Sequence, residues 1–378
     1  MSHDPEAGAR INSDAIREAM QRVMDTRPGA FHVHMHGGRG LPTLSPMDRD
    51  ELPRLVEALR VVGPKTSLWV PGSAAPVVAQ VTIVGQPMLL ADPGMSRAGA
   101  ALERFSRQSF LGDGAQNALT RVRIGIVGLG GGGSHIVQQL THLGVQRFRL
   151  FDSDVVDESN LNRLVGATAA DALSKTAKVE VARRVIAAVS PEAEVVTHTG
   201  RWQDRPDLLR GCDLVFGAVD TFAGRRELEV ACRRHLIPYI DIGMDVHRVG
   251  DEPPRIAGQV ILSMPGGPCM FCLGFLTEER LAQEAAEYGA AGPRPQVVWP
   301  NGVLASVAVG VCIDLIAGWT GARDRPVYLS YEGNAGIVTP HVRLKYLTSD
   351  RCSHHPTEQV GDPVIQFVPV ELARLRYL

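Results

Sequence analysis

The sequence lacks an excess of charge of either sign, a dense set of cysteines and a secretory leader. Its 378 residues include 39 lysines and arginines and 41 aspartates and glutamates, so the formal net charge is −2. This balance excludes a generally basic nucleic-acid binder, and we expect no nucleic-acid partner. No basic segment followed by an apolar run opens the chain, which predicts a cytoplasmic protein. The 6 cysteines are too few for a disulfide framework and have a spacing more typical of a metal site.

Long apolar runs are also scarce, and only residues 302–319 resemble a membrane span. Asp314 interrupts this run, glycine and alanine recur within it, and no basic flank anchors it. A membrane-spanning helix needs about 20 consecutive, predominantly apolar residues. We therefore expect a helix buried in a soluble protein and no membrane partner.

The length of the chain predicts two domains or one large α/β domain with an addition. Residues 1–95 contain helical periodicity at 13–24 and 46–62 beside short β-rich runs, which predicts a small α/β domain. Residues 96–347 form the larger predicted domain, and residues 348–378 form a C-terminal segment.

The larger domain begins with β-rich runs that alternate with helical segments. The predicted strands are 123–127, 148–151, 194–197, 214–218 and 239–242, and the predicted helices are 134–143, 178–189 and 223–235. This alternation predicts an α/β fold with a Rossmann-like, mostly parallel sheet and helices on both faces. Later strands at 259–263, 327–330 and 337–344 predict an antiparallel extension, interrupted by a helix near 303–318.

A glycine-rich turn at 127–134 follows a predicted strand and opens a predicted helix. Its glycines Gly128, Gly130, Gly131 and Gly133 satisfy the pattern G-x-G-x-x-G in the context that this motif needs. Glycines let the backbone approach a phosphate, while the helix N-terminus offers unpaired N–H groups. About 20 residues further on, Asp152 ends the second strand, where a carboxylate accepts hydrogen bonds from ribose hydroxyls. The turn predicts nucleotide binding but does not separate NAD from ATP.

Polar and cationic residues follow Asp152 and distinguish between these nucleotides. They are Asp154, Asn160, Asn162, Arg163 and Lys178. Hydride transfer has no obvious need for such a group, whereas a reaction at the phosphates does, because fixed cations stabilise the negative charge that builds up there.

With these residues the chain closely resembles the ThiF/MoeB/HesA family, the bacterial relatives of ubiquitin-activating enzymes. The resemblance runs from about residue 102 to residue 344. Its motifs, in chain order, are RFSRQ at 104–108, the glycine turn, DSD at 152–154, SNLNR at 159–163, KVE at 178–180, VD at 219–220 and GQV at 258–260.

The resemblance implies an enzyme that binds ATP and Mg²⁺ and adenylates the C-terminal glycine carboxylate of a ubiquitin-fold protein. Carried over by position, Asp152 and Asp154 belong to the nucleotide site, with Asp152 holding the ribose. Asn160, Arg163 and Lys178 face the phosphates. Asp220 serves the Mg²⁺, and Arg107 reaches into the partner subunit's site of a homodimer.

Cys269 and Cys272 form a C-x-x-C pair. In the family, a second pair near the C-terminus completes a tetrahedral zinc site, and here the corresponding stretch contains Cys352, His354 and His355. We predict a structural Zn²⁺ held by Cys269, Cys272, Cys352 and His355, with His354 as the competing fourth ligand. Four protein ligands leave no open position for catalysis.

Family members that pass the activated carboxylate on as a thioester use a cysteine in the crossover segment after the first zinc pair. This chain has none between Cys272 and Cys312. We therefore predict adenylation without an internal thioester step.

The N-terminal histidines are similar to the H-x-H…S-x-x-D motif of JAMM (JAB/MPN) metal-dependent isopeptidases. His34, His36 and Asp48 match the metal ligands of that motif. The spacer is longer than usual, and the strand that carries the activating glutamate has no room before it. Residues 1–95 are therefore interpreted as a partial JAMM-like domain that binds metal at these residues, or as a remnant used for docking or dimer contacts.

The leading hypothesis is an ATP-dependent adenylyltransferase that activates a ubiquitin-like or sulfur-carrier protein ending in Gly-Gly. The chain itself ends in Arg-Tyr-Leu, so the substrate is expected to be another polypeptide. Two alternatives stay open: an NAD-dependent dehydrogenase on the same nucleotide fold, and a non-catalytic scaffold that binds a ubiquitin-fold partner.

Overall fold

The computed structural model describes residues 103–112, 114–248, 250–265, 267–286, 295–320, 326–347 and 352–355, together with six short strands before residue 92. The chain divides into a smaller unit, made of Met1–Ile83, Leu89–Ser96 and Gly361–Leu378, and a larger unit, made of Val84–Met88 and Arg97–Val360.

In the smaller unit the described strands form three antiparallel pairs. These are β1 (Ser2–Asp4) with β2 (Gly8–Arg10), β3 (Leu68–Trp69) with β4 (Val77–Val78), and β5 (Val81–Ile83) with β6 (Leu89–Ala91). The predicted helices at 13–24 and 46–62 lie outside the described residues, as do His34, His36 and Asp48. The small α/β domain and its metal ligands stay predictions.

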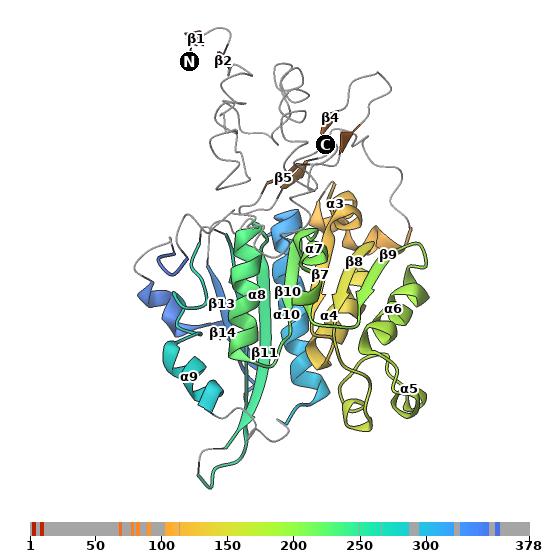
Figure 1. Cartoon of the computed structure of the whole chain (residues 1–378), viewed down its shortest axis with the longest axis vertical. Coiled ribbons are helices and arrows are strands. Elements are labelled where there is room, and N and C mark those ends of the chain that lie inside the picture. Colours follow the sequence, from red (N-terminus) through yellow and green to blue (C-terminus); the bar gives the residue numbers. More distant parts are fainter. Residues whose placement is uncertain are drawn as a thin grey trace. The chain divides into compact units, whose positions relative to one another are not determined.

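The larger unit contains one mixed sheet, with the strand order β14-β13-β12-β11-β10-β7-β8-β9 (Figure 1). Its strands are β7 (Arg123–Val127), β8 (Arg147–Phe151), β9 (Glu194–His198), β10 (Leu214–Gly217), β11 (Tyr239–His247), β12 (Arg255–Ser263), β13 (Val327–Glu332) and β14 (Ile337–Pro340). Neighbours from β9 through β11 are parallel, and neighbours from β11 through β14 are antiparallel. The predicted mostly parallel sheet with an antiparallel extension is confirmed.

Helices cover both faces of this sheet (Figure 1). On one face α10 (Val298–Ala317) packs on α4 (Gly131–His142), β11 and β12, and α4 packs on α6 (Lys178–Val189). On the other face lie α8 (Phe222–Arg234) and the short α7 (Pro206–Arg210). The shorter helices are α3 (Ala115–Arg121), α5 (Ala169–Ser174), α9 (Glu278–Ala286), η1 (Glu103–Leu111), η2 (Glu158–Asn160), η3 (Trp202–Asp204) and η4 (Val342–Tyr346).

Helix α10 contains the apolar run that resembles a membrane span. Among the described residues it is the one helix long and apolar enough to cross a membrane, and 56% of its most apolar window is buried inside the fold. It begins before the predicted helix and accommodates Pro300 in its first turn, where a missing N–H leaves no hydrogen bond unmade. The helix therefore serves as a core element of the sheet domain.

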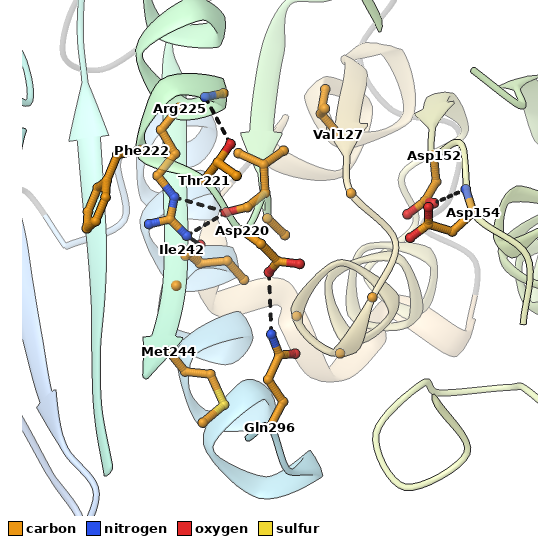
Figure 2. A pocket seen from close by; sticks show the side chains of 18 of the residues that line it. Val127, Asp152, Asp154, Asp220, Thr221, Phe222, Arg225, Ile242, Met244 and Gln296 are labelled. Atoms are coloured by element: carbon orange, nitrogen blue, oxygen red, sulfur yellow. Dashed lines mark hydrogen bonds between the residues drawn. The ribbon is translucent and has the colours of Figure 1, made fainter. Parts of the chain in front are cut away.

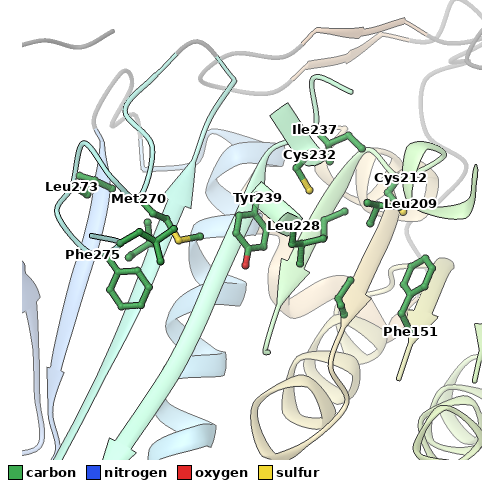
Figure 3. Packing of buried hydrophobic residues seen from close by; sticks show 14 of the residues in the cluster. Phe151, Leu209, Cys212, Leu228, Cys232, Ile237, Tyr239, Met270, Leu273 and Phe275 are labelled. Carbon is green, nitrogen blue, oxygen red and sulfur yellow. The ribbon is translucent and has the colours of Figure 1, made fainter. Parts of the chain in front are cut away.

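The core between the sheet and α8 includes a loop as well as regular elements. Figure 3 shows Phe151 from β8, Leu228 from α8 and Tyr239 from β11 in one buried cluster with Met270 and Phe275. Burying a large apolar side chain contributes about 1.5–3 kcal/mol, so the loop that follows Cys269 is firmly attached.

Several elements differ from the predictions, for identifiable reasons. Strands β11 and β12 pair over Tyr239–His247 and Arg255–Ser263, beyond the predicted ends, because their outer halves are only partly buried and carry charged residues. The predicted strand at 337–344 ends at Pro340, which cannot donate to a ladder, and a 3₁₀ turn follows. Helix α9 was not predicted, because it is short and none of its residues is buried.

The first turn of α4 packs directly on the turn that precedes it. A Cβ atom at Gly133 would overlap the carbonyl oxygen of Gly128, and Gly128 itself has a φ of 88°. Such a φ is in the left-handed region that favours glycine. The glycines thus form the first helical turn, which explains why α4 begins three positions before the predicted helix.

Gly133→Ala is expected to lower the free energy of unfolding by about 2–3 kcal/mol, because the new methyl group would meet backbone that cannot move aside. The matched control is Gly310→Ala in α10, where no atom lies within 4 Å of the added Cβ. There the higher helix propensity of alanine should stabilise the protein by about 0.5–1 kcal/mol. Urea denaturation of both variants measures the difference, and equal unfolding free energies would contradict the close packing.

Candidate active site

A cavity of about 690 Å³ lies beyond the carboxyl ends of β7, β8 and β10 (Figure 2). Strand β7 is central in the parallel part of the sheet. The chain first adds β8 and β9 on one side of β7 and then crosses over to add β10 and β11 on the other side. Such a switch point leaves a crevice in which open α/β sheets bind their ligands. The cavity is therefore where the fold itself places a binding site.

The glycine turn contributes backbone to this cavity. Gly128, Gly130 and Gly131 line it, and Gly130 has no atom within 4 Å of the place where a Cβ would stand. A Cβ at Gly131 would lie 2.5 Å from Nδ2 of the buried Asn301. Gly133 is not among the lining residues, and the structure assigns it the packing role described above.

Asp152 joins the end of β8 to the glycine turn. Its Oδ2 accepts a hydrogen bond from the Leu129 N–H at 2.6 Å, and its Oδ1 accepts one from the Asp154 N–H at 2.8 Å (Figure 2). Burial raises the pKa of this carboxyl above its usual value, although the Lys178 charge and the two N–H groups oppose the shift. The carboxylate lines the cavity, as a ribose acceptor should.

Lys178 is the first residue of α6 and lies 9% exposed in the cavity wall. Its Nζ is 2.7 Å from Oδ2 of Asp154, whose side chain is 63% exposed. The ammonium group is therefore held at the cavity by Asp154, and solvent weakens the attraction between the two charges. It is available to a more strongly charged phosphate group.

The SNLNR motif divides its side chains between the cavity and the protein interior. Arg163 lines the cavity, and its Nη1 donates to the Ser159 carbonyl at 2.7 Å and to Oδ1 of Asn162 at 3.0 Å. Asn160, which was predicted to face the phosphates, is buried and is not among the lining residues. Its Oδ1 accepts from the Asp157 N–H at 3.1 Å, because the side chain caps the short η2 helix.

Asp220 follows β10 and lies exposed at the cavity. Nε2 of Gln296 donates to its Oδ1 at 3.4 Å (Figure 2), and the Gln296 carbonyl oxygen accepts from Nδ2 of Asn162 at 3.1 Å. Gln296 thus connects the residue predicted to bind Mg²⁺ with the turn that carries Arg163. Sequence reasoning missed Gln296 because it belongs to none of the motifs.

A buried ion pair supports the turn before Asp220. Nε of Arg225 lies 3.5 Å from Oδ1 of Asp241, which is fully buried and also accepts the Tyr239 hydroxyl at 2.8 Å. Burial raises the pKa of Asp241, while the Arg225 charge opposes the shift. The guanidinium also donates to the carbonyl oxygens of Val219 and Ile242, which ties the ends of β10 and β11 together. An aspartate inside an apolar strand was the sequence signal that could have revealed this pair.

Arg107 lies in η1 and is exposed. It is not among the residues that line the cavity of its own chain. Its predicted reach into the partner subunit's site stays a prediction.

The cysteine cluster brings together segments that are 80 residues apart in the sequence. Sγ of Cys272 lies 3.7 Å from Sγ of both Cys269 and Cys352. Two sulfur atoms on a tetrahedral Zn²⁺ are about 3.8 Å apart, given a Zn–S distance of about 2.3 Å. A hydrogen bond from Cys269 lowers the pKa of Cys352 to about 4 and raises that of Cys269. The cluster therefore favours a thiolate, the form that binds metals.

His354, and not His355, completes the cluster. Nδ1 of His354 lies 3.2 Å from Sγ of Cys272 and 3.7 Å from Sγ of Cys269, and its ring stacks on Phe271. The neighbouring His355 belongs to a second group with Cys269 and the buried Glu229, and its Nε2 lies 3.7 Å from Oε2 of Glu229. Adjacent side chains project in different directions, so the two histidines join different groups that share Cys269. The geometry around the three cysteines thus favours the competing candidate His354 over the predicted ligand His355.

The comparisons with known proteins agree with this arrangement of residues. The model of the ThiF family matches residues 103–353 of the 378. The chain belongs to the ThiF family. The match begins after the N-terminal histidines, so the JAMM-like resemblance gains no support from it.

Two relatives show how far the ThiF family likeness extends. The chain is 31% identical over 221 residues to the molybdopterin-synthase adenylyltransferase of Salmonella typhimurium, which covers 57% of this chain and 82% of the relative. It is 30% identical over 177 residues to the SAMP-activating enzyme E1 of Haloferax volcanii, which covers 46% of this chain and 62% of that relative. The predicted ThiF/MoeB-type adenylyltransferase agrees with the names of these relatives.

Solved structures share the fold. E. coli MccB with SeMet MccA superposes with a TM-score of 0.51 at 21% identity, over 63% of this chain and 71% of that chain. SeMet PaaA superposes with a TM-score of 0.52 at 21% identity, over 67% of this chain and 87% of that chain. These two solved structures therefore share the fold described above.

The metal ligands are tested by a pair of adjacent variants. His354→Ala is expected to release zinc from the purified protein, because it removes one of four ligands, whereas His355→Ala should keep it. Metal content by mass spectrometry after dialysis against a weak chelator measures both. Zinc lost from His355→Ala but kept in His354→Ala would restore the ligand set predicted from the sequence.

Proposed function

We propose that this protein is an ATP-dependent adenylyltransferase that activates the C-terminal carboxylate of a ubiquitin-like or sulfur-carrier protein. One observation carries the proposal. A single cavity is lined by the glycine turn, by the carboxylates of Asp152 and Asp220 and by the cations of Arg163 and Lys178. These groups come from five separate segments, and a dehydrogenase has no evident need for the cations.

The chemistry follows from the charges of the reactants. A chain terminus has a pKa of about 3.3–3.7, so near pH 7 it is already an anionic nucleophile and needs no general base. Its oxygen forms a bond to the α-phosphorus of ATP while the bond from that phosphorus to the bridging oxygen breaks. The products are an acyl adenylate and pyrophosphate, which takes the electron pair with it.

The side chains of the cavity overcome the repulsion between the two anions. Asp152 accepts hydrogen bonds from the ribose hydroxyls, and the N–H groups at the start of α4 face the phosphates. Lys178 and Arg163 stabilise the charge that accumulates on the departing pyrophosphate. Asp220 would hold Mg²⁺, which would supply further positive charge at the phosphates. Binding in the cavity keeps the carboxylate and the phosphorus in line.

The comparisons support the nucleotide and the class of substrate. Relatives of this chain are named for the activation of molybdopterin synthase, of SAMP and of ubiquitin-like modifiers, and E. coli MccB has been solved with ATP. A substrate ending in Gly-Gly fits this proposal, because glycine has no side chain to obstruct a narrow approach to the phosphorus.

The cysteines favour an enzyme that stops at the acyl adenylate. Cys212, Cys232 and Cys312 are buried, and burial raises the pKa of Cys312. Cys269, Cys272 and Cys352 belong to the cluster that fits a structural Zn²⁺. With all six cysteines assigned in this way, the proposal includes no internal thioester. It includes a homodimer and a cytoplasmic location, as expected from the sequence.

The decisive measurement is ATP–pyrophosphate exchange with candidate proteins that end in Gly-Gly. Lys178→Gln is expected to reduce the exchange rate about 10²–10³-fold, because it removes a fixed charge that acts in the transition state. Lys175→Gln is the matched control, since Lys175 is exposed and pairs with Asp157 away from the cavity. No exchange with any candidate, together with tight binding, would favour the scaffold; retained NAD(H) would favour the dehydrogenase.

The homodimer is tested by mixing two inactive variants. Arg107→Ala and Asp220→Ala together should recover about one quarter of the wild-type exchange rate, because half of the randomly formed dimers contain one intact site. The matched mixture of Lys178→Gln and Asp220→Ala should recover nothing, since both residues line the same cavity of one chain. Equal rates in the two mixtures would contradict the contribution of Arg107 across the dimer.

A further inference from the structure

Helix α9 forms one wall of the cavity and is attached differently from the other walls. Arg280, Gln283 and Glu284 line the cavity from one face of this helix. None of the residues of α9 is buried, whereas α10 buries ten of its own. A nine-residue helix without a buried face has little stability of its own, so its polar contacts decide whether it stays in place.

Two side chains one turn apart provide these contacts. The carboxylate of Glu284 accepts the N–H groups of Phe222 at 2.8 Å and of Ala223 at 2.9 Å, which are the first two residues of α8. The positive end of a helix favours a negative charge at this place. Nη1 of Arg280 donates to the Phe275 carbonyl oxygen at 2.5 Å, and the guanidinium lies 5.7 Å from the Phe222 ring centre.

The residues just before α10 attach to the same turn. Gln296 donates to Asp220, which lies two positions before Phe222. Residues 220–223 therefore form hydrogen bonds with both Glu284 and Gln296. These residues have two roles. Asp220 is the residue that would bind the metal, and the N–H groups of Phe222 and Ala223 hold α9 in place.

We propose that α9 is a displaceable wall of the cavity, latched by Glu284 on the N-terminus of α8, and that a polypeptide substrate enters by displacing it. The inference rests on the proposed function, because it assigns the entry route of the same substrate. An incoming chain terminus is anionic, and in the closed arrangement it faces the carboxylate of Glu284. Displacing α9 removes that negative charge from the cavity and opens the wall that Arg280, Gln283 and Glu284 form. Glu284 is thus a positioning residue that controls access.

The latch itself is tested by hydrogen exchange of the full-length protein, which requires no catalysis. Glu284→Gln, and more strongly Glu284→Ala, should speed amide exchange in α9 and at the start of α8 about 10-fold. Glu278→Gln is the matched control, because Glu278 is exposed on the same helix and is not among the lining residues. Unchanged exchange in the Glu284 variants, or equal acceleration by Glu278→Gln, would overturn the latch.

The entry route is tested by pyrophosphate exchange at saturating ATP. Glu284→Ala should lower the KM for the polypeptide about 3–10-fold and leave the KM for ATP unchanged, since only the substrate must open the wall. An unchanged polypeptide KM would overturn the role in access. If the unmodified protein shows no pyrophosphate exchange at all, the proposed function and the entry route fail together. The hydrogen-exchange result then decides separately whether Glu284 latches α9.

Discussion

The candidate active site depends on one contact between backbone segments, in which the first turn of α4 lies directly on the turn after β7. There is no space for a Cβ at Gly133, and this closeness places the start of α4 at the cavity beyond the ends of β7, β8 and β10. Asp152 fixes the same turn from β8 through the Leu129 N–H. Arg225 fixes the facing turn after β10 through the carbonyl oxygens of Val219 and Ile242. Hydrogen bonds to the backbone therefore hold the two turns that border the site in place.

Much of this arrangement could be predicted from the sequence, because its elements have strong local signals. β7 and α6 begin and end where apolar periodicity and the flanking residues predicted, and Asp152, Arg163, Lys178 and Asp220 all line the cavity. The residues that were missed act over long sequence distances. Glu284 and Gln296 reach the turn at 220–223 from positions that share no motif with it. Adjacent histidines have the same local signal, so only the path of the chain decides between His354 and His355.

The site combines groups that solvent screens with groups that are fully enclosed. Asp220 and Asp154 are exposed, so ligand charges can compete for them without a large desolvation cost. Asp241 and Arg225 are buried, and their interaction is protected from water. The exposed carboxylates can therefore change partners when the reactants bind. The buried ion pair keeps the turn that carries Asp220 in place. It also explains why a wall as weakly attached as α9 can coexist with a firmly held nucleotide site.

The cysteine cluster connects the segment after β12 with the segment after η4, and β13 and β14 lie between these two anchor points along the chain. A bound ion would link the two ends of this stretch and close it into a loop. Such a link lowers the conformational entropy of the unfolded chain far more than that of the folded chain. Losing the ion would consequently release the antiparallel edge of the sheet first, while the parallel half that bears the crevice keeps its own core. The availability of the metal would then determine how often β13 and β14 open by local unfolding.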